Sequence, residues 1–116
     1  MVLAFVSMPN LSSVNKSDND TILITPPPAG GPNGPRSSLY NPFAAYHTTG
    51  YVIITSEDNT YGEVCIQIEN PDFSISETLF DTSDGIVYCP IVESAGYYHI
   101  SIITEQGYVF TGDFYI

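Results

Sequence analysis

The stretch "ESAGYYHISIITEQGYVFTGDFYI" (93–116) holds two alternating runs on either side of a short turn at 105–107. Gly107 can take the left-handed position of a three-residue hairpin loop, which makes Thr104 and Tyr108 the first pair of a hairpin. One face of that hairpin is then almost wholly apolar, with the pairs Tyr98–Phe114, Ile100–Gly112 and Ile102–Phe110. The other face carries Tyr97–Tyr115, His99–Asp113, Ser101–Thr111 and Ile103–Val109. A shift of one residue would bury Asp113, so the pattern predicts this register with the apolar face against a core.

The rest of the chain from residue 37 onward is also built from short strand-like runs. Strands are expected at 38–46, with a bend at Asn41-Pro42, and at 51–56, 63–69, 73–80 and 85–92, while 21–25 is a candidate for a short edge strand. No window shows sustained helical periodicity, so essentially no helix is expected. About seven short strands separated by turn residues predict an all-β, two-sheet antiparallel sandwich. The strand order in 70–85 stays open, because this segment is longer than a tight hairpin needs.

The charge of the chain is strongly one-sided. It has 13 acidic residues against two basic ones, Lys16 and Arg36, and a formal net charge of −11. Asp18 and Asp20 are the only acidic residues before position 37, so the remaining 11 lie in 37–116, where there is no Lys or Arg. Such a surface repels phosphate backbones, which argues against a nucleic acid as partner. A cation or a basic protein suits it better.

The first 36 residues differ in composition from the rest of the chain. "MVLAFVS" (1–7) is apolar but too short to span a membrane, and we interpret it as the remnant of a secretory signal peptide; a merely apolar terminus is the alternative. "PPPAGGPNGP" (26–35) is typical of a semi-rigid, extended tether. We therefore expect a disordered or extended segment at 1–36 and the sandwich at 37–116. The expected location is secreted, periplasmic or at the cell surface.

Tyr98 stands two residues before Ile100, which occupies the position where immunoglobulin-like strands carry a cysteine. This is the place of the tyrosine corner, whose ring enters the core while its hydroxyl bonds to backbone upstream. The chain also resembles the short secreted domains of unknown function found in gut Bacteroidetes. The matching residues are Arg36, Ser37, Pro42, Phe43 and Ala45 near the opening, and Gly96, Tyr98, Gly112 and Phe114 at the end. This resemblance implies an immunoglobulin- or fibronectin-like sandwich without an assigned activity.

The sequence leaves open whether the two cysteines pair: their placement argues against a bond, although a secreted context in general favours pairing. Cys65 falls on the outward face of one strand, and Cys89 falls on a strand of the other sheet. A disulfide requires Cα atoms within about 7 Å, which this placement disfavours.

His99 and Asp113 face each other across the outer surface of the hairpin, between Tyr97 and Tyr115. A His–Asp pair invites a catalytic interpretation with Ser101 nearby, but the sequence has no Gly-x-Ser-x-Gly elbow or oxyanion loop. We interpret the pair as an ordinary cross-strand contact, and the four residues together as a candidate surface for a protein or glycan partner. No enzyme activity and no cofactor are predicted. His47 is expected to be an isolated loop or edge residue.

Two acidic segments offer oxygen ligands of the kind that Ca²⁺ prefers. They are "SEDN" (56–59) with Glu63, and "NKSDND" (15–20). Neither has the spacing of an EF-hand, and the chain has no zinc pattern, so no metal site is predicted.

Together these patterns favour a non-catalytic binding, adhesion or scaffolding module of the cell exterior. One alternative is a sorting domain, because the last third resembles the C-terminal sandwich domains of type 9 secretion; "TGDFYI" (111–116), however, is acidic where those end in a basic strand. The other is a carbohydrate-binding module, disfavoured by the absence of Trp. Edge strands without lysine could also support a dimer or the addition of a partner strand.

Overall fold

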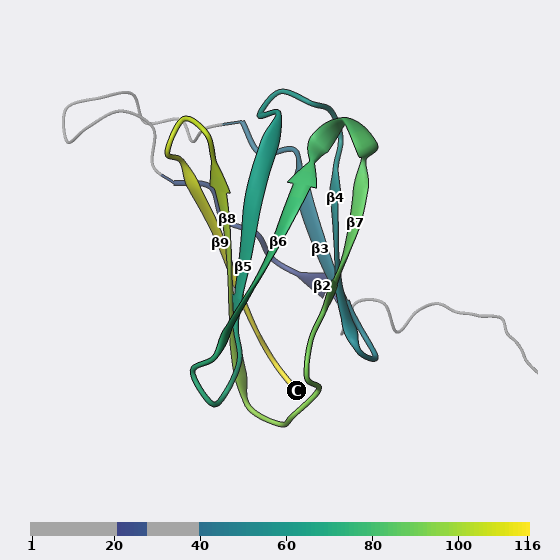
Figure 1. Cartoon of the computed structure of the whole chain (residues 1–116), viewed down its shortest axis with the longest axis vertical. Helices are drawn as coiled ribbons and strands as arrows, with labels where there is room; N and C mark the ends of the chain where they lie inside the picture. Colours follow the sequence, from purple (N-terminus) through teal and green to yellow (C-terminus); the bar gives the residue numbers. More distant parts are fainter. Residues whose placement is uncertain (1–20, 28–39) are drawn as a thin grey trace, which may run out of the picture.

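The computed structural model describes residues 21–27 and 40–116, which form two antiparallel sheets packed face to face (Figure 1). The first sheet has the order β2-β3-β4-β7 and the second has the order β6-β5-β8-β9. The strands are β2 (Thr21–Ile22), β3 (Phe43–Thr48), β4 (Tyr51–Ser56), β5 (Glu63–Glu69), β6 (Ile75–Asp81), β7 (Ile86–Pro90), β8 (Tyr97–Thr104) and β9 (Val109–Tyr115). Within these residues the helical content is one 3-10 turn, η1 (Thr82–Asp84), and none of them lies in a helix that could span a membrane. The predicted all-β sandwich is confirmed.

The predicted register of the last hairpin is confirmed at every pair from Tyr97–Tyr115 to Ile103–Val109. Tyr98, Ile100 and Ile102 are fully buried, as the apolar face requires. The hydroxyl of Tyr98 donates to the carbonyl oxygen of Ser94 at 2.5 Å, which is the upstream backbone bond of a tyrosine corner. The inner strand of the second sheet is thereby tied to the loop that precedes it.

The turn that follows β6 explains the strand order in 70–85, which the sequence left open. After the β5–β6 hairpin the chain crosses to the first sheet, where β7 pairs with β4. Asp81 caps η1 by accepting hydrogen bonds from the amide and the hydroxyl of Ser83, at 3.0 and 2.8 Å. Gly85 then takes a left-handed conformation with φ of 82°, which a side chain would disfavour. β6 therefore lies beside β5 in the sheet of β8 and β9, as Figure 1 shows.

The core lies between the sheets and contains no ionised group. Its buried apolar residues are Ile22, Ile24, Phe43, Ala45, Val52, Ile54, Tyr61, Val64, Ile66, Ile68, Phe80, Cys89, Tyr98, Ile100, Ile102 and Phe110. Three strands are shorter or shifted relative to the prediction. β3 begins only after Pro42, where the side chain of Asn41 accepts a hydrogen bond from the amide of Phe43. β6 begins two residues late, after a braced loop, and β7 ends at Pro90.

Residues 21–25 belong to the sandwich, although the predicted domain boundary at residue 37 leaves them out. Ile22 pairs with Ala45 of β3, and three residues later Thr25 exchanges two backbone hydrogen bonds with Thr111 of β9, at 2.7 and 3.0 Å. The segment thus crosses from one sheet to the other, and the side chains of Ile22 and Ile24 are buried beneath it. The predicted signal remnant and nearly all of the predicted tether, from residue 28 onward, lie outside the described residues.

Gly112 allows this segment to approach β9. A methyl group at Gly112 would lie 2.8 Å from Cδ1 of Ile24 and 2.9 Å from the carbonyl oxygen of Leu23. We expect Gly112→Ala to lower the free energy of unfolding by on the order of 1–2 kcal/mol, measured by urea denaturation. Ile24→Val in the same background should recover part of this loss, because valine lacks Cδ1. An unchanged stability of Gly112→Ala would show that residues 21–25 do not pack here in solution.

The two outer faces of the sandwich differ in charge. Every outward side chain of β3, β4 and β7 is uncharged; they are Ala44, Tyr46, Thr48, Tyr51, Ile53, Thr55, Ile86, Tyr88 and Pro90. The 11 carboxylates of 37–116 lie on β5, β6, β9 and η1 and in the loops. One sheet is therefore an uncharged, tyrosine-rich surface, and the other is acidic.

Candidate functional site

The four residues of the predicted surface patch lie together on the outer face of β8 and β9. Asp113 is the centre of their contacts: its Oδ1 accepts a hydrogen bond from the hydroxyl of Tyr97 at 2.5 Å and lies 2.6 Å from Nδ1 of His99. The ring of Tyr115 stands 5.3 Å from that of Tyr97, tilted by 49°. The predicted juxtaposition is confirmed, while its role in binding stays a prediction.

The protonation of this network follows from its hydrogen bonds. The bond from Tyr97, followed by that from His99, holds the pKa of Asp113 below its usual value. The same bond to Asp113 is the main cause that raises the pKa of Tyr97 to about 12. An ionised carboxylate only accepts, so Nδ1 of His99 donates to it. The patch therefore holds the carboxylate of Asp113 among three rings.

Ser101 is not engaged by His99 as a nucleophile would be. Among the described residues, no hydrogen bond connects the hydroxyl of Ser101 to either ring nitrogen of His99, whose Nδ1 atom contacts Asp113. A serine nucleophile needs a base within hydrogen-bond reach, about 2.6–3.2 Å, and donors for an oxyanion. The pair is thus a cross-strand contact on an exposed sheet, as predicted from the sequence.

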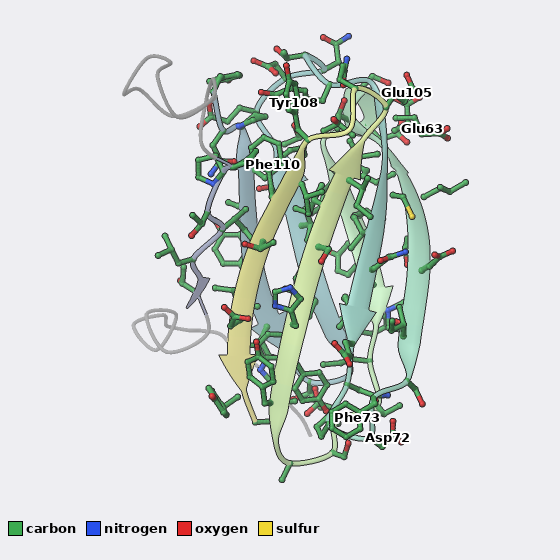
Figure 2. The ribbon with its side chains drawn as sticks, turned by 90° about the vertical axis from the view of Figure 1, so that its left-hand side faces the viewer. Glu63, Asp72, Phe73, Glu105, Tyr108 and Phe110 are labelled. Atoms are coloured by element: carbon green, nitrogen blue, oxygen red, sulfur yellow. The ribbon has the colours of Figure 1, made fainter. Side chains whose placement is uncertain are left out.

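A loop next to the patch adds an aromatic residue that the sequence interpretation missed. Phe73 was assigned to a strand, yet it sits in the β5–β6 loop, where 81% of the residue is exposed (Figure 2). Its φ of 70° is left-handed, which is uncommon for a bulky residue. Asn-Pro-Asp at 70–72 is a turn signal that could have placed Phe73 in a loop.

The loop is braced around Asn70. Its side-chain oxygen accepts hydrogen bonds from the amides of Asp72 and Ser74 at 3.2 and 3.0 Å, and its carbonyl accepts one from the amide of Phe73 at 2.9 Å. Pro71 packs directly on Gly96, where an added Cβ would come within 2.7 Å of it. The exposed ring is therefore carried on a rigid support, and the strained φ is held in place by its neighbours.

A cavity of about 350 Å³ joins this loop to the patch. It is lined by Glu69, Asn70, Pro71, Phe73, Gly96 and Tyr97. Tyr97 belongs both to the cavity and to the Asp113 network, so the two features form one continuous surface. We call the set Phe73, Tyr97, His99, Asp113 and Tyr115 the aromatic patch.

His47 is not the isolated loop or edge residue that was expected. It lies on the inward face of β3, where Nε2 is 2.8 Å from Oε2 of Glu93 and the ring stacks on Phe114 at 5.4 Å. The same Glu93 oxygen accepts a hydrogen bond from the amide of Gly50 at 2.7 Å. Sequence reasoning missed this contact because it joins residues 46 positions apart. Glu93 has a φ of 59°, and its contacts connect the β3–β4 turn to the loop before β8.

Both cysteines are free thiols in the structure. Cys65 is on β5 and Cys89 is on β7, in different sheets. Burial raises the pKa of both thiols, and in Cys65 the charge of Glu77 adds to it. Neither is in the electropositive, accessible setting that activates a thiolate.

The acidic segment 56–59 is engaged in internal contacts. Asp58 accepts hydrogen bonds from the hydroxyl of Tyr40 at 2.8 Å and from the amide of Thr60 at 3.0 Å. The first of these bonds raises the pKa of Tyr40 to about 12. Within 21–27 and 40–116, no three His, Cys, Asp or Glu side chains are grouped to hold a metal ion. The second candidate segment, 15–20, lies outside the described residues.

Two sheets of these strands, with a tyrosine corner at the start of β8, define an immunoglobulin-like β-sandwich. A solved structure with this architecture is that of a DUF3244 family protein with an immunoglobulin-like β-sandwich fold from Bacteroides vulgatus. It superimposes with a TM-score of 0.62 at 11% sequence identity, covering 84% of this chain and 97% of the other. At this identity the likeness shows the fold, which agrees with the resemblance seen in the sequence. No protein-family model matches the chain, and no curated protein matches it.

Proposed function

We propose that the chain is a non-catalytic binding module that recognises a protein partner through the aromatic patch. The observation that carries this proposal is Phe73, an almost fully exposed ring held in a strained backbone conformation by the Asn70 turn. Strained, rigidly supported positions cluster at functional sites, and exposed aromatic residues are the usual anchors of protein interfaces.

The charges around the patch favour a basic segment of the partner. Three carboxylates lie near the rings of the patch. Glu69 lines the cavity beside Phe73 and Tyr97, and Asp72 precedes Phe73. Asp113 lies on β9, which pairs with the strand of Tyr97. A Lys or Arg side chain can place its stem against the rings and its cationic head against a carboxylate. The net charge of −11 would also speed the encounter with a cationic partner at low salt.

A glycan fits the same surface less well. Sugar rings stack on flat aromatic platforms, whereas the rings of Tyr97 and Tyr115 are inclined by 49° to each other. A glycan array that gave a signal dependent on Tyr97 would favour the carbohydrate-binding alternative.

We further propose that the module works in a secreted, periplasmic or cell-surface setting. The apolar run at 1–7 and the resemblance to secreted Bacteroidetes domains support this location. Fractionation of cells that express the full gene tests it, and a purely cytoplasmic product would contradict it.

Selection from a displayed library of random peptides tests the binding proposal. The wild-type domain should enrich sequences that combine Lys or Arg with an apolar residue. Phe73→Ser and Tyr97→Ser should each weaken binding of the selected peptides at least about tenfold, the effect of removing an interface anchor. The matched control is Tyr88→Ser, an exposed tyrosine on the opposite sheet, which should leave binding unchanged. Equal effects of all three substitutions would rule out the aromatic patch as the binding surface.

A further inference from the structure

β6 is an edge strand, and the direction of its peptide groups can be derived from the hydrogen bonds at its two ends. The amide of Asn70 donates to the carbonyl of Ser74, and the amide of Thr82 donates to the carbonyl of Gly62. Hydrogen-bonded pairs alternate along an antiparallel ladder, so Ser76, Thr78 and Phe80 are the residues that bond to β5. The peptide groups of the intervening residues, Ile75, Glu77 and Leu79, therefore point away from the sheet. Within the described part of the chain, no strand pairs with that side of β6.

The outward side chains of this edge strand are two exposed apolar residues and two carboxylates, Glu77 and Asp81. Ile75 is 58% exposed and Leu79 is 67% exposed, and the strand contains no Pro or Lys. Natural edge strands are commonly protected by such residues against pairing with another chain. With these carboxylates as its protection, the edge of β6 is suited to receive a strand that carries basic residues.

A cavity opens next to this edge, between the two sheets. Its volume is about 190 Å³, and its lining is mostly apolar: Ile68, Asn70, Ser76, Pro90, Ile91 and Val92. On the opposite side of the sandwich the corresponding seam is covered by Ile22 and Ile24. The β6–β7 side has no such cover among the described residues, so an inward-facing side chain of an added strand could enter the cavity.

We propose that β6 accepts an extended segment of a partner protein as an additional strand, with an apolar side chain in this cavity. Strand addition derives affinity from backbone hydrogen bonds and specificity from pockets for alternate side chains. The outward face of β6 carries Glu77 and Asp81, so the outward residues of the incoming strand are basic. A second copy of this chain is a poor occupant, because it would bring two net charges of −11 together.

A synthetic peptide that alternates valine and lysine is the probe, and a peptide of the same composition with its valines in one block and its lysines in another is the control. Fluorescence anisotropy should show binding of the alternating peptide and at least about tenfold weaker binding of the block peptide, since both have the same charge. Equal affinities would show that attraction between charges alone explains the binding and would overturn the proposal, as would no binding of either peptide.

The matched variants are Leu79→Pro and Leu79→Ala. Both remove the leucine side chain, but only proline removes the amide that points to the free edge, without touching the ladder to β5. Leu79→Pro should weaken binding at least about tenfold, and Leu79→Ala should change it by less than about threefold. Equal binding by both would contradict strand addition.

Hydrogen exchange on the wild-type protein gives a readout that does not depend on the folding of any variant. The amides of Ile75, Glu77 and Leu79 should become protected when the alternating peptide is added. Binding without that protection would place the peptide elsewhere. Phe73→Ser and Tyr97→Ser should leave this protection of the β6 amides unchanged, so the edge and the aromatic patch can fail independently.

Discussion

Replacing Tyr98 with alanine is expected to lower the free energy of unfolding by about 3–5 kcal/mol, the usual cost of removing a large aromatic side chain from a core. Tyr98 is completely buried, and its ring stacks on Phe114 with centroids 4.8 Å apart and planes within 13°. Small domains have only about 5–15 kcal/mol of stability in all. Tyr98→Ala should therefore be largely unfolded at 37 °C or unfold at low urea concentration.

The substitution Tyr98→Phe distinguishes the contribution of the hydroxyl to stability from that of the ring. It keeps the packing but loses the 2.5 Å bond to the carbonyl of Ser94, at an expected cost of about 1–2 kcal/mol. Urea unfolding followed by circular dichroism measures both variants. The matched control is Tyr88→Phe, at an exposed tyrosine of β7 whose hydroxyl makes no hydrogen bond within the described residues, and it should leave the unfolding midpoint nearly unchanged. Equal midpoint shifts for Tyr88→Phe and Tyr98→Phe would show that the hydrogen bond of the buried hydroxyl does not stabilise the fold.

Glu93→Ala is expected to cost about 2–3 kcal/mol at neutral pH, because it removes a charged acceptor shared by two donors, the amide of Gly50 and the ring of His47. The bond from Gly50, followed by that from His47, holds the pKa of Glu93 below its ordinary value of 4.5. A carboxyl whose folded pKa is lowered stabilises the fold fully above its unfolded pKa. That contribution disappears as the pH falls through the folded pKa.

The stability difference between wild type and Glu93→Ala should therefore shrink as the pH falls below 4.5. Protonation of other carboxylates relieves the repulsion in both proteins, so the difference isolates Glu93. Urea unfolding at a series of pH values measures it. The control is Glu105→Ala, in the β8–β9 turn, whose side chain makes no hydrogen bond within the described residues. A stability difference that grew as the pH fell below 4.5 would contradict this account.

Local patterns in the sequence were sufficient for the last hairpin and for the grouping of Tyr97, His99, Asp113 and Tyr115. Both follow from a period of two and one turn residue, Gly107, so no distant contact had to be known. The sequence alone does not show to which sheet each edge strand belongs. Nothing local indicates that Thr25 pairs with Thr111, or that β6 stays beside β5 while β7 crosses over.

Phe73 was not predicted as part of the candidate site for the same reason: its position depends on contacts between distant segments. Phe73 approaches Tyr97 because the β5–β6 loop packs through Pro71 on Gly96. That contact depends on the folded arrangement of two loops, and alternation in 73–80 equally fits a strand. Likewise, Glu93 and His47 are polar residues with no local partner, and only the packing of two loops brings them together.

The unequal charge of the two outer faces gives the domain a preferred orientation at surfaces. The carboxylate side chains of residues 40–116 lie away from the outer face of β3, β4 and β7, so their charge gives the sandwich an electric dipole directed from one sheet to the other. Near any negatively charged layer the acidic sheet is repelled, and the tyrosine-bearing sheet turns toward the layer. The aromatic patch and the open edge of β6 would then face the surrounding solution.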